Sequence, residues 1–252
     1  MKKRVLITGA TAGIGEATAH KLAESGFDLI ITGRRMERLE TLAKTLQQNY
    51  QTEVQTLCFD IRNRQQVEEA LSSLPADKSK IDILVNNAGL AIGYERFDEC
   101  NPSDWDTMID TNIKGALYMA QAVSKQMVSR GEGLIINIGS IAGMQALPNG
   151  VVYSTTKAAL HAMSLGMRVD LLPFGIRVCE LRPGNTMTEF VDVRSRGDLS
   201  RKETVYAGLN PLHADDIAEA IRWMANLPEN ININEIEITP QRQANVNHLI
   251  RK

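Results

Sequence analysis

Tyr153 and Lys157 lie four residues apart near the start of a predicted helix, a spacing that places both side chains on one face, one turn apart. A tyrosine phenol has a pKa of about 10, too high for a general base at neutral pH, and a nearby ammonium group favours the phenolate and lowers that pKa. Ser140 follows a short apolar segment, and its hydroxyl could hold a substrate oxygen beside Tyr153. Together these residues predict proton transfer to or from an alcohol or carbonyl oxygen, with Tyr153 as general acid and base.

A glycine cluster lies between a short apolar segment and a helical segment near the N-terminus. Gly9, Gly13 and Gly15 have the spacing G-x3-G-x-G, which differs from the common G-x-G-x-x-G dinucleotide motif. The physical effect is similar, because glycines allow a tight turn and let the backbone and the helix N-terminus approach a pyrophosphate. The alternative is a glycine-rich turn that binds no ligand.

The residues after the second predicted strand bear on the choice of cofactor. An NAD site usually has an acidic residue there, but this chain has Thr32-Gly33-Arg34-Arg35. The two guanidinium groups suit the 2′-phosphate of NADP, because arginine binds phosphate as a planar fork. The alternative is a solvated basic start of a helix, although cations at a helix N-terminus oppose the helix dipole.

Two further segments follow predicted strands and are expected to meet the cofactor. Asp60 could accept a hydrogen bond from the adenine amine, or it could be a loop or capping residue near Asn63. Asn86-Asn87-Ala88-Gly89 follows the fourth strand, where small polar residues meet ligands in parallel sheets, although an ordinary turn has the same composition. The cofactor-binding residues predicted from these segments are Gly9, Thr11, Gly13, Ile14, Gly15, Arg34, Arg35, Asp60, Ile61, Asn87, Ala88 and Gly89.

The elements that carry these residues alternate between short apolar strands and helices. Strands are predicted at residues 5–8, 29–32, 54–59, 83–85, 134–138, 176–181 and 235–238, with helices between them. One long helix is predicted at residues 104–129, with Ser103 and Asp106 spaced like a capping box. Continuous apolar strands are typical of a parallel sheet buried on both faces. The pattern predicts one α/β domain over residues 1–252, a doubly wound Rossmann-type sheet of about seven strands with helices on both faces. Residues 185–210 are the least regular segment and are expected to form a substrate loop.

Composition excludes several other classes of protein. The 252-residue chain has a net charge of -2, which predicts no general attraction to nucleic acid. No apolar segment reaches the roughly 18 residues of a membrane span, and we expect a cytoplasmic enzyme. The three cysteines (Cys58, Cys100 and Cys179) have no disulfide or zinc spacing, and the four histidines are scattered, so no metal site is predicted.

Singly, each of these features is common on ordinary proteins, but their order along the chain is more specific. The series of glycine cluster, Asn-Asn-Ala-Gly, serine and Tyr-x-x-x-Lys resembles the short-chain dehydrogenase/reductase family over nearly the whole chain. The resemblance implies that Tyr153 is the acid/base, Ser140 polarises the substrate, and Lys157 binds the nicotinamide ribose and lowers the pKa of Tyr153. It also implies that Asn112 orders a water leading to Lys157. Pro183, Gly184 and Thr188 are expected to lie against the nicotinamide end of the cofactor, and together with Tyr153 and Lys157 they complete the predicted cofactor-binding set.

A narrower resemblance is to NADP-dependent 3-hydroxy acid dehydrogenases. It is carried by segments such as Thr32-Gly33-Arg34-Arg35, Thr188-Glu189-Phe190 and the stretch from Leu227 to Asn234. That subgroup oxidises serine, allo-threonine and other 3-hydroxy acids, reduces malonic semialdehyde and is typically a homotetramer. Residues 144–147 and Arg182 depart from the subgroup pattern.

An acidic substrate needs a cation to pair with its carboxylate. Arg194 and Arg196 in the predicted loop are the candidates, and the alternative for each is a solvated loop arginine. Two other functions stay open, namely reduction of a bulkier ketone or ketoacyl thioester, and NADP sensing without catalysis. The complete set of Ser140, Tyr153 and Lys157 favours an enzyme, because a protein that only binds nucleotide has no chemical need for it.

Overall fold

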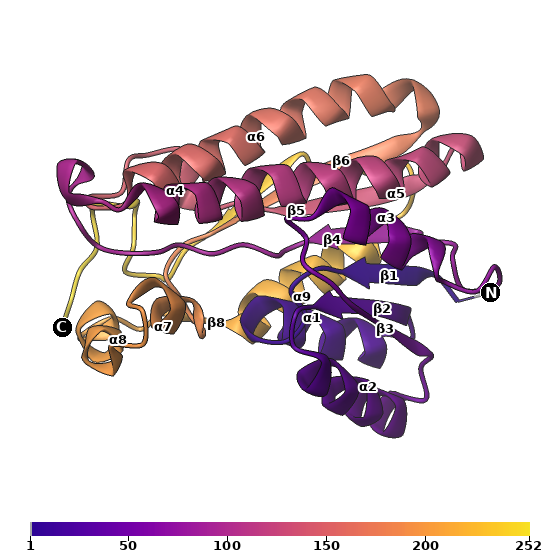
Figure 1. The fold of residues 1–252 in the computed structure, drawn as a ribbon, viewed down its shortest axis with the longest axis horizontal. Helices are drawn as coiled ribbons and strands as arrows, with labels where there is room; N and C mark the ends of the chain where they lie inside the picture. Colours follow the sequence, from indigo (N-terminus) through magenta and orange to yellow (C-terminus); the bar gives the residue numbers. More distant parts are fainter. Residues whose placement is uncertain (1) are drawn as a thin grey trace.

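The computed structural model describes residues 2–252, apart from the side chains at positions 199 and 202. Its centre is a seven-stranded sheet in which every adjacent pair of strands is parallel (Figure 1). The spatial order is β3-β2-β1-β4-β5-β6-β9. The strands are β1 (Arg4–Ile7), β2 (Asp28–Gly33), β3 (Val54–Cys58), β4 (Ile83–Asn86), β5 (Gly133–Ile138), β6 (Ile176–Pro183) and β9 (Glu235–Ile238). The predicted doubly wound sheet of about seven strands is confirmed.

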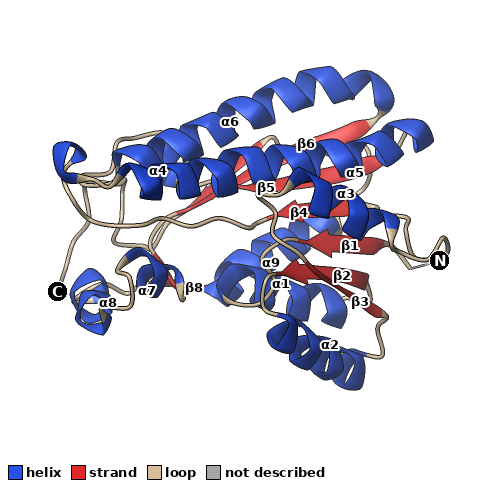
Figure 2. Cartoon of the chain, in the orientation of Figure 1, coloured by secondary structure: helices blue, strands red, loops and turns tan. Residues whose placement is uncertain are grey.

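Helices cover both faces of this sheet (Figure 2). One face packs against α1 (Gly13–Glu24), α2 (Met36–Tyr50) and α9 (Ala214–Ala225), and the other against α3 (Arg64–Ser72), α5 (Ala116–Arg130) and α6 (Val151–Leu171). In β1, Val5 and Ile7 join the first core while Leu6 joins the second. Both faces of the strand are therefore apolar, which explains why its sequence does not alternate. Within the described residues, no helix combines the length and apolar character needed to cross a bilayer.

The long helix predicted at residues 104–129 differs from the one observed. It begins earlier, as α4 (Pro102–Ile109), and Asn101 caps it by accepting a hydrogen bond from the Ser103 amide, so the capping box at Ser103 is wrong. A π-helical turn at Asp110–Gly115 then separates α4 from α5. Such turns often mark functional positions, and this one holds Asn112.

The segment at residues 185–210 is more regular than predicted. It contains the short strand β7 (Thr186–Met187), which pairs with β8 (Leu212–His213), and the helices α7 (Phe190–Arg194) and α8 (Leu199–Tyr206). Asp198 caps α8 by accepting from the Ser200 amide. These helices are too short to show a clear apolar period, which explains why the sequence pattern did not predict them. Figure 1 shows α7, α8 and the C-terminus at the same end of the molecule.

Candidate active site

A cavity of about 590 Å³ lies at the carboxyl ends of the central strands, where the order of a doubly wound sheet reverses. Almost every predicted site residue lines it. They are Gly9, Thr11, Gly13, Ile14, Arg34, Arg35, Asp60, Ile61, Asn87, Ala88, Gly89, Ser140, Tyr153, Lys157, Pro183, Gly184 and Thr188. The exceptions are Gly15 and Asn112, which lie behind the cavity wall.

Gly15 supports the glycine turn from behind. A Cβ at this position would collide with the carbonyl oxygen of Gly9, so no other residue fits without moving the turn. The turn is also tied to β4, since the Asn87 side chain donates to the Thr8 carbonyl (2.9 Å) and the Thr8 hydroxyl accepts from the Asn87 and Ala88 amides. The two predicted cofactor segments therefore form one rigid cradle, in which backbone can approach a pyrophosphate closely.

The two arginines after β2 differ in their surroundings. The Arg34 side chain is 59% exposed, and its nearest carboxylate, Asp60, lies 4.0 Å away. Arg35 instead donates to the hydroxyl and carbonyl of Thr11 and pairs with Glu189, which also pairs with Arg38. Arg34 is therefore the freer of the two to bind a phosphate, while Arg35 connects the glycine turn to the segment before α7.

Asp60 lies at the cavity edge and is held by Arg62, which accounts for most of the lowering of its carboxyl pKa. It does not cap the following helix. Asn63 caps α3 by accepting from the Gln66 amide. The capping alternative for Asp60 is therefore wrong, and its position beside Ile61 on the cavity wall fits the adenine end of a dinucleotide.

The residues predicted to do the chemistry meet in the cavity. Tyr153 and Lys157 project from the first turns of α6, and the Lys157 ammonium nitrogen lies 6.0 Å from the centre of the Tyr153 ring. Lys157 Nζ donates to the carbonyl of Ile138 (2.8 Å) at the end of β5. Ser140 follows two residues later, and its hydroxyl accepts a hydrogen bond from the Ala142 amide and acts to lower the pKa of the Tyr153 phenol. The residues that carry the phenol, hydroxyl and ammonium groups therefore all line the same cavity.

The electrostatics of this group differ from the expectation that Lys157 lowers the pKa of Tyr153. Burial raises the pKa of the Tyr153 phenol, and the Ser140 hydrogen bond and the Arg194 charge act in the opposite direction. Burial also lowers the pKa of Lys157 to about 8, against the charge of Glu180. Desolvation outweighs the neighbouring charges in both groups because both are enclosed by protein.

Asn112 is positioned by the π-helical turn, and its side chain makes three hydrogen bonds. Its Oδ1 accepts from the Leu90 amide (2.8 Å), and its Nδ2 donates to the Leu90 carbonyl (2.7 Å) and the Thr156 hydroxyl (3.0 Å). These bonds join the segment after β4 to α6 beside Lys157. The water that Asn112 was expected to order stays a prediction.

The two candidate carboxylate-binding arginines lie in different places. Arg194 lines the cavity and is 8% exposed. Its guanidinium group donates to the carbonyls of Gly93 and Asn149 (3.0 Å each) and stacks 4.1 Å from the centre of the Tyr94 ring. Arg196 lies outside the cavity and pairs with Glu95 and Asp104, at 2.6 Å each. Arg196 as a substrate-binding residue is therefore wrong.

Sequence reasoning missed the apolar wall and the C-terminal part of the cavity. The wall includes Leu90, Tyr94, Leu147, Phe190, Val193 and Tyr206, and the tail contributes Gln243, Val246, Leu249 and Arg251. Gln243 anchors the tail by accepting from the Asn185 amide (2.8 Å). The tail has no periodic pattern that would have indicated this position. Of the departures from the subgroup pattern at residues 144–147, Leu147 faces the cavity, while Met144 is exposed.

Comparisons with known proteins agree with this geometry. A family profile described as short chain dehydrogenase matches residues 3–198. The chain is 46% identical over 241 residues to a Salmonella typhi protein named NADP-dependent 3-hydroxy acid dehydrogenase YdfG, covering 95% of this chain and 96% of that protein. It is 42% identical to a sulfoacetaldehyde reductase of Chromohalobacter salexigens, covering 95% and 94%. A solved structure described as the closed form of serine dehydrogenase complexed with NADP+ superposes with a TM-score of 0.92, at 44% identity over 99% of both chains.

Proposed function

The chain belongs to the short-chain dehydrogenase family, and on that premise we propose that it is an NADP-dependent oxidoreductase that interconverts a small 3-hydroxy acid, such as serine, with its carbonyl form. The reaction class follows from the family and from the geometry around Tyr153. The substrate class is supported by one observation above all, namely the buried guanidinium group of Arg194 at the cavity wall.

Arg194 has the properties expected of a group that binds a small anion. Its pKa is lowered mainly by burial, which means that its charge is poorly solvated. Its guanidinium group donates hydrogen bonds to backbone carbonyls, and among the described residues no carboxylate forms an ion pair with it. A buried charge is stabilised strongly by an opposite charge, so an anionic substrate would gain binding energy here that a neutral alcohol would not. The relatives that act on 3-hydroxy acids and on sulfoacetaldehyde, by name, have anionic substrates.

The cradle residues support NADP as the cofactor. Arg34 is exposed directly after β2, where the sequence has two arginines instead of the acidic residue that would bind a ribose hydroxyl, and the relatives include NADP-dependent enzymes. Bound NADPH supplies the hydride for carbonyl reduction, and NADP+ accepts it in the reverse reaction. The residues that would hold the nucleotide are the glycine turn, Asp60 and Ile61, residues 87–89, and the segment from Pro183 to Thr188.

The chain's own residues perform the proton transfer. In the reduction direction, the Tyr153 phenol donates its proton to the substrate oxygen while the Ser140 hydroxyl donates a hydrogen bond to the same oxygen. In this proposal the charge of the Lys157 ammonium group, 6.0 Å from the Tyr153 ring centre, opposes the burial that disfavours the phenolate. Asn112 holds the segment after β4 against α6, which keeps the floor of the site in place.

We extend the proposal to a homotetramer and a cytoplasmic location. Exposed apolar side chains on α5, α6 and the following turn support an interface between copies, namely Leu117, Leu165, Val169 and Leu172. Analytical ultracentrifugation of the purified protein would test the assembly. If these side chains form the interface, replacement of Val169 and Leu172 by serine should reduce the molecular mass of the assembly in solution.

The experiment that tests the function follows NADPH absorbance with serine, other 3-hydroxy acids, a semialdehyde, sulfoacetaldehyde and uncharged apolar ketones side by side. The anionic compounds should be turned over with the highest kcat/KM. Arg194→Met should raise KM for the anionic substrates by at least tenfold while sparing the uncharged ones, and Arg196→Met is the matched control. Faster turnover of apolar ketones, or equal effects of Arg194→Met on both groups, would favour the bulkier-ketone alternative instead.

A further inference from the structure

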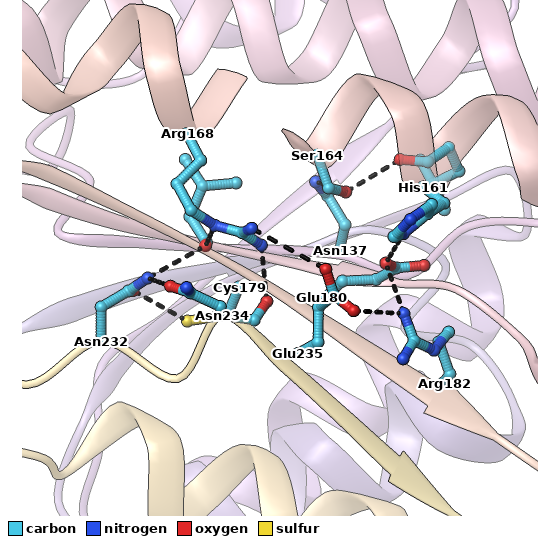
Figure 3. Close-up of polar contacts among 12 residues, drawn as sticks. Asn137, His161, Ser164, Arg168, Cys179, Glu180, Arg182, Asn232, Asn234 and Glu235 are labelled. Atoms are coloured by element: carbon cyan, nitrogen blue, oxygen red, sulfur yellow. Dashed lines mark hydrogen bonds and ion pairs between the residues drawn. The ribbon is translucent and has the colours of Figure 1, made fainter. Parts of the chain in front are cut away.

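A buried carboxylate lies behind the reaction centre, outside the cavity. Glu180 is on β6 and is 1% exposed. Figure 3 shows it between His161 of α6 and Arg182 of β6, with Arg168 and Glu235 in the same polar cluster. Fully buried glutamates are rare unless they are paired, and the mechanism described above gives this one no role.

One oxygen of Glu180 is well bound, and the other is not. The Oε2 atom lies 2.6 Å from His161 Nδ1 and 3.3 Å from the Arg182 guanidinium group. A carboxylate only accepts hydrogen bonds, so the proton of this contact belongs to the histidine ring. The Oε1 atom is buried and has no hydrogen-bond partner in the described structure. It faces Gly139, where a Cβ would collide with it.

This position places Glu180 next to the residues that perform the proton transfer. Gly139 lies between Ile138, whose carbonyl accepts from Lys157 Nζ, and Ser140. On α6, Tyr153, Lys157 and His161 follow one another at intervals of four residues and therefore share a face. Glu180 binds the third member of this row and acts electrostatically on the second, since its charge raises the pKa of Lys157 against the effect of burial.

We propose that Glu180, held by His161 and Arg182 behind Gly139, is a positioning residue whose negative charge keeps Lys157 protonated beside Tyr153. The proposal rests on the proposed function, because it concerns the ammonium group that this function uses. Its physical basis is that a fully enclosed lysine tends to lose its proton unless a negative charge lies nearby.

The other charged and titratable groups around Glu180 do not replace it. Arg182 balances Glu180 and pairs with Glu235 (2.9 Å) and Glu237 (3.5 Å) of β9. Arg168 of α6 pairs with Glu235 at 3.9 Å, and Tyr153 and His161 are the titratable groups one turn from Lys157 on α6. Of these carboxylates, Glu180 is the one whose charge acts on Lys157.

A divalent cation is a weaker explanation of the same cluster. His161, Glu180 and Glu235 offer ligand atoms within 4.8 Å of one another. The Arg182 guanidinium group, however, already lies between the two carboxylates and hydrogen-bonds both of them. A metal ion would have to displace this built-in cation, so the cluster is better explained as an internal charge network.

The test measures the titration of Lys157 directly. Isotopically labelled lysine in the full-length protein is followed by NMR, with the Lys157 signal assigned by its loss in Lys157→Arg. Glu180→Gln should lower the midpoint by about one pH unit from its wild-type value of about 8. Glu235→Gln is the matched control, because it removes a carboxylate from the same arginine, and it should leave the midpoint unchanged.

Turnover supplies the second readout. The rate of carbonyl reduction should fall as Lys157 loses its proton, and in Glu180→Gln this fall should begin about one pH unit lower. An unchanged Lys157 midpoint in Glu180→Gln would overturn the inference. If that variant does not fold, Glu180→Asp takes its place. The aspartate side chain is shorter by one methylene group, which moves the carboxylate, so the midpoint of the Lys157 titration should still fall. Absence of turnover in the wild-type protein would refute the proposed function alone, since the NMR titration does not depend on activity.

Discussion

Replacement of Lys157 by methionine should abolish turnover and at the same time stabilise the fold. Lys157 is 6% exposed, and burial lowers its pKa from 10.5 to about 8. A shift of this size corresponds to about 3 kcal/mol by which the folded state disfavours the charged lysine relative to the unfolded chain. Methionine has a similar length and no charge, so it removes this penalty, and the loss of the hydrogen bond to the Ile138 carbonyl costs about 1 kcal/mol.

The net gain at neutral pH should be about 2 kcal/mol, which for a chain of this size raises Tm by about 4–8 °C. The pH dependence gives a sharper check. Below a pH of about 8, Lys157 is protonated in both the folded and unfolded states, so the wild-type protein bears the full penalty. As pH rises from about 8 to 10.5, only the unfolded state keeps the proton, and the wild-type protein recovers stability. The Tm difference between variant and wild type should therefore shrink across this interval.

The assay is thermal melting of both proteins at pH values from about 6.5 to 10, with Lys125→Met as control. Lys125 is an exposed lysine on α5, so its replacement should give no pH-dependent difference. A Lys157→Met protein that melts at or below the wild-type temperature at neutral pH would refute the reasoning. A Tm difference that stays constant with pH would do the same, because it would show that the charge of Lys157 is not the source of the effect.

Three further predictions concern the cofactor, the proton donor and the strand end. Arg34→Ala should lower the preference for NADPH over NADH by at least tenfold, measured as the ratio of Kd values, and an unchanged ratio would contradict a phosphate contact at Arg34. Tyr153→Phe should reduce turnover by about 10²–10⁴-fold with NADPH binding nearly intact, and substantial residual turnover would exclude Tyr153 as the proton donor. Gly139→Ala should destabilise the protein by about 1–3 kcal/mol, because its methyl group meets the Glu180 carboxylate, and Glu180→Gln should not relieve this collision because its side chain has the same shape.

The sheet was predictable because its strands have to be apolar on both faces. The run Val5-Leu6-Ile7 contributes to two cores on opposite sides of β1, and only a strand covered by helices on both sides needs such a run. The interruption between α4 and α5 was not predictable, because a π-helical turn changes the backbone hydrogen bonding without changing the apolar pattern on which the prediction depended.

The chemical residues were predictable for a similar reason, and their partners were not. Helix geometry places Tyr153 and Lys157 on one face, so their proximity could be predicted from their spacing alone. The choice between Arg194 and Arg196 depends instead on how the segment after α7 turns, since Arg196 adopts a left-handed backbone conformation (φ 53°) and meets Glu95 and Asp104 outside the cavity. Two arginines separated by one residue cannot be ranked without that geometry.

The burial of three charged side chains, which the sequence pattern did not predict, also explains how the site could select its substrate. Lys157, Glu180 and Arg194 are each at least nine-tenths buried, and burial of each charge disfavours folding. Lys157 and Glu180 offset part of this cost for one another, and Arg182 and His161 offset more of it for Glu180.

Arg194 has carbonyl groups and an aromatic ring around it but no ion pair among the described residues. An anion bound in the cavity would complete that balance, whereas a neutral alcohol would leave Arg194 unpaired. Under the proposed function, selectivity for hydroxy acids therefore arises because the Arg194 guanidinium group gains an ion-pair partner only when an anionic substrate binds.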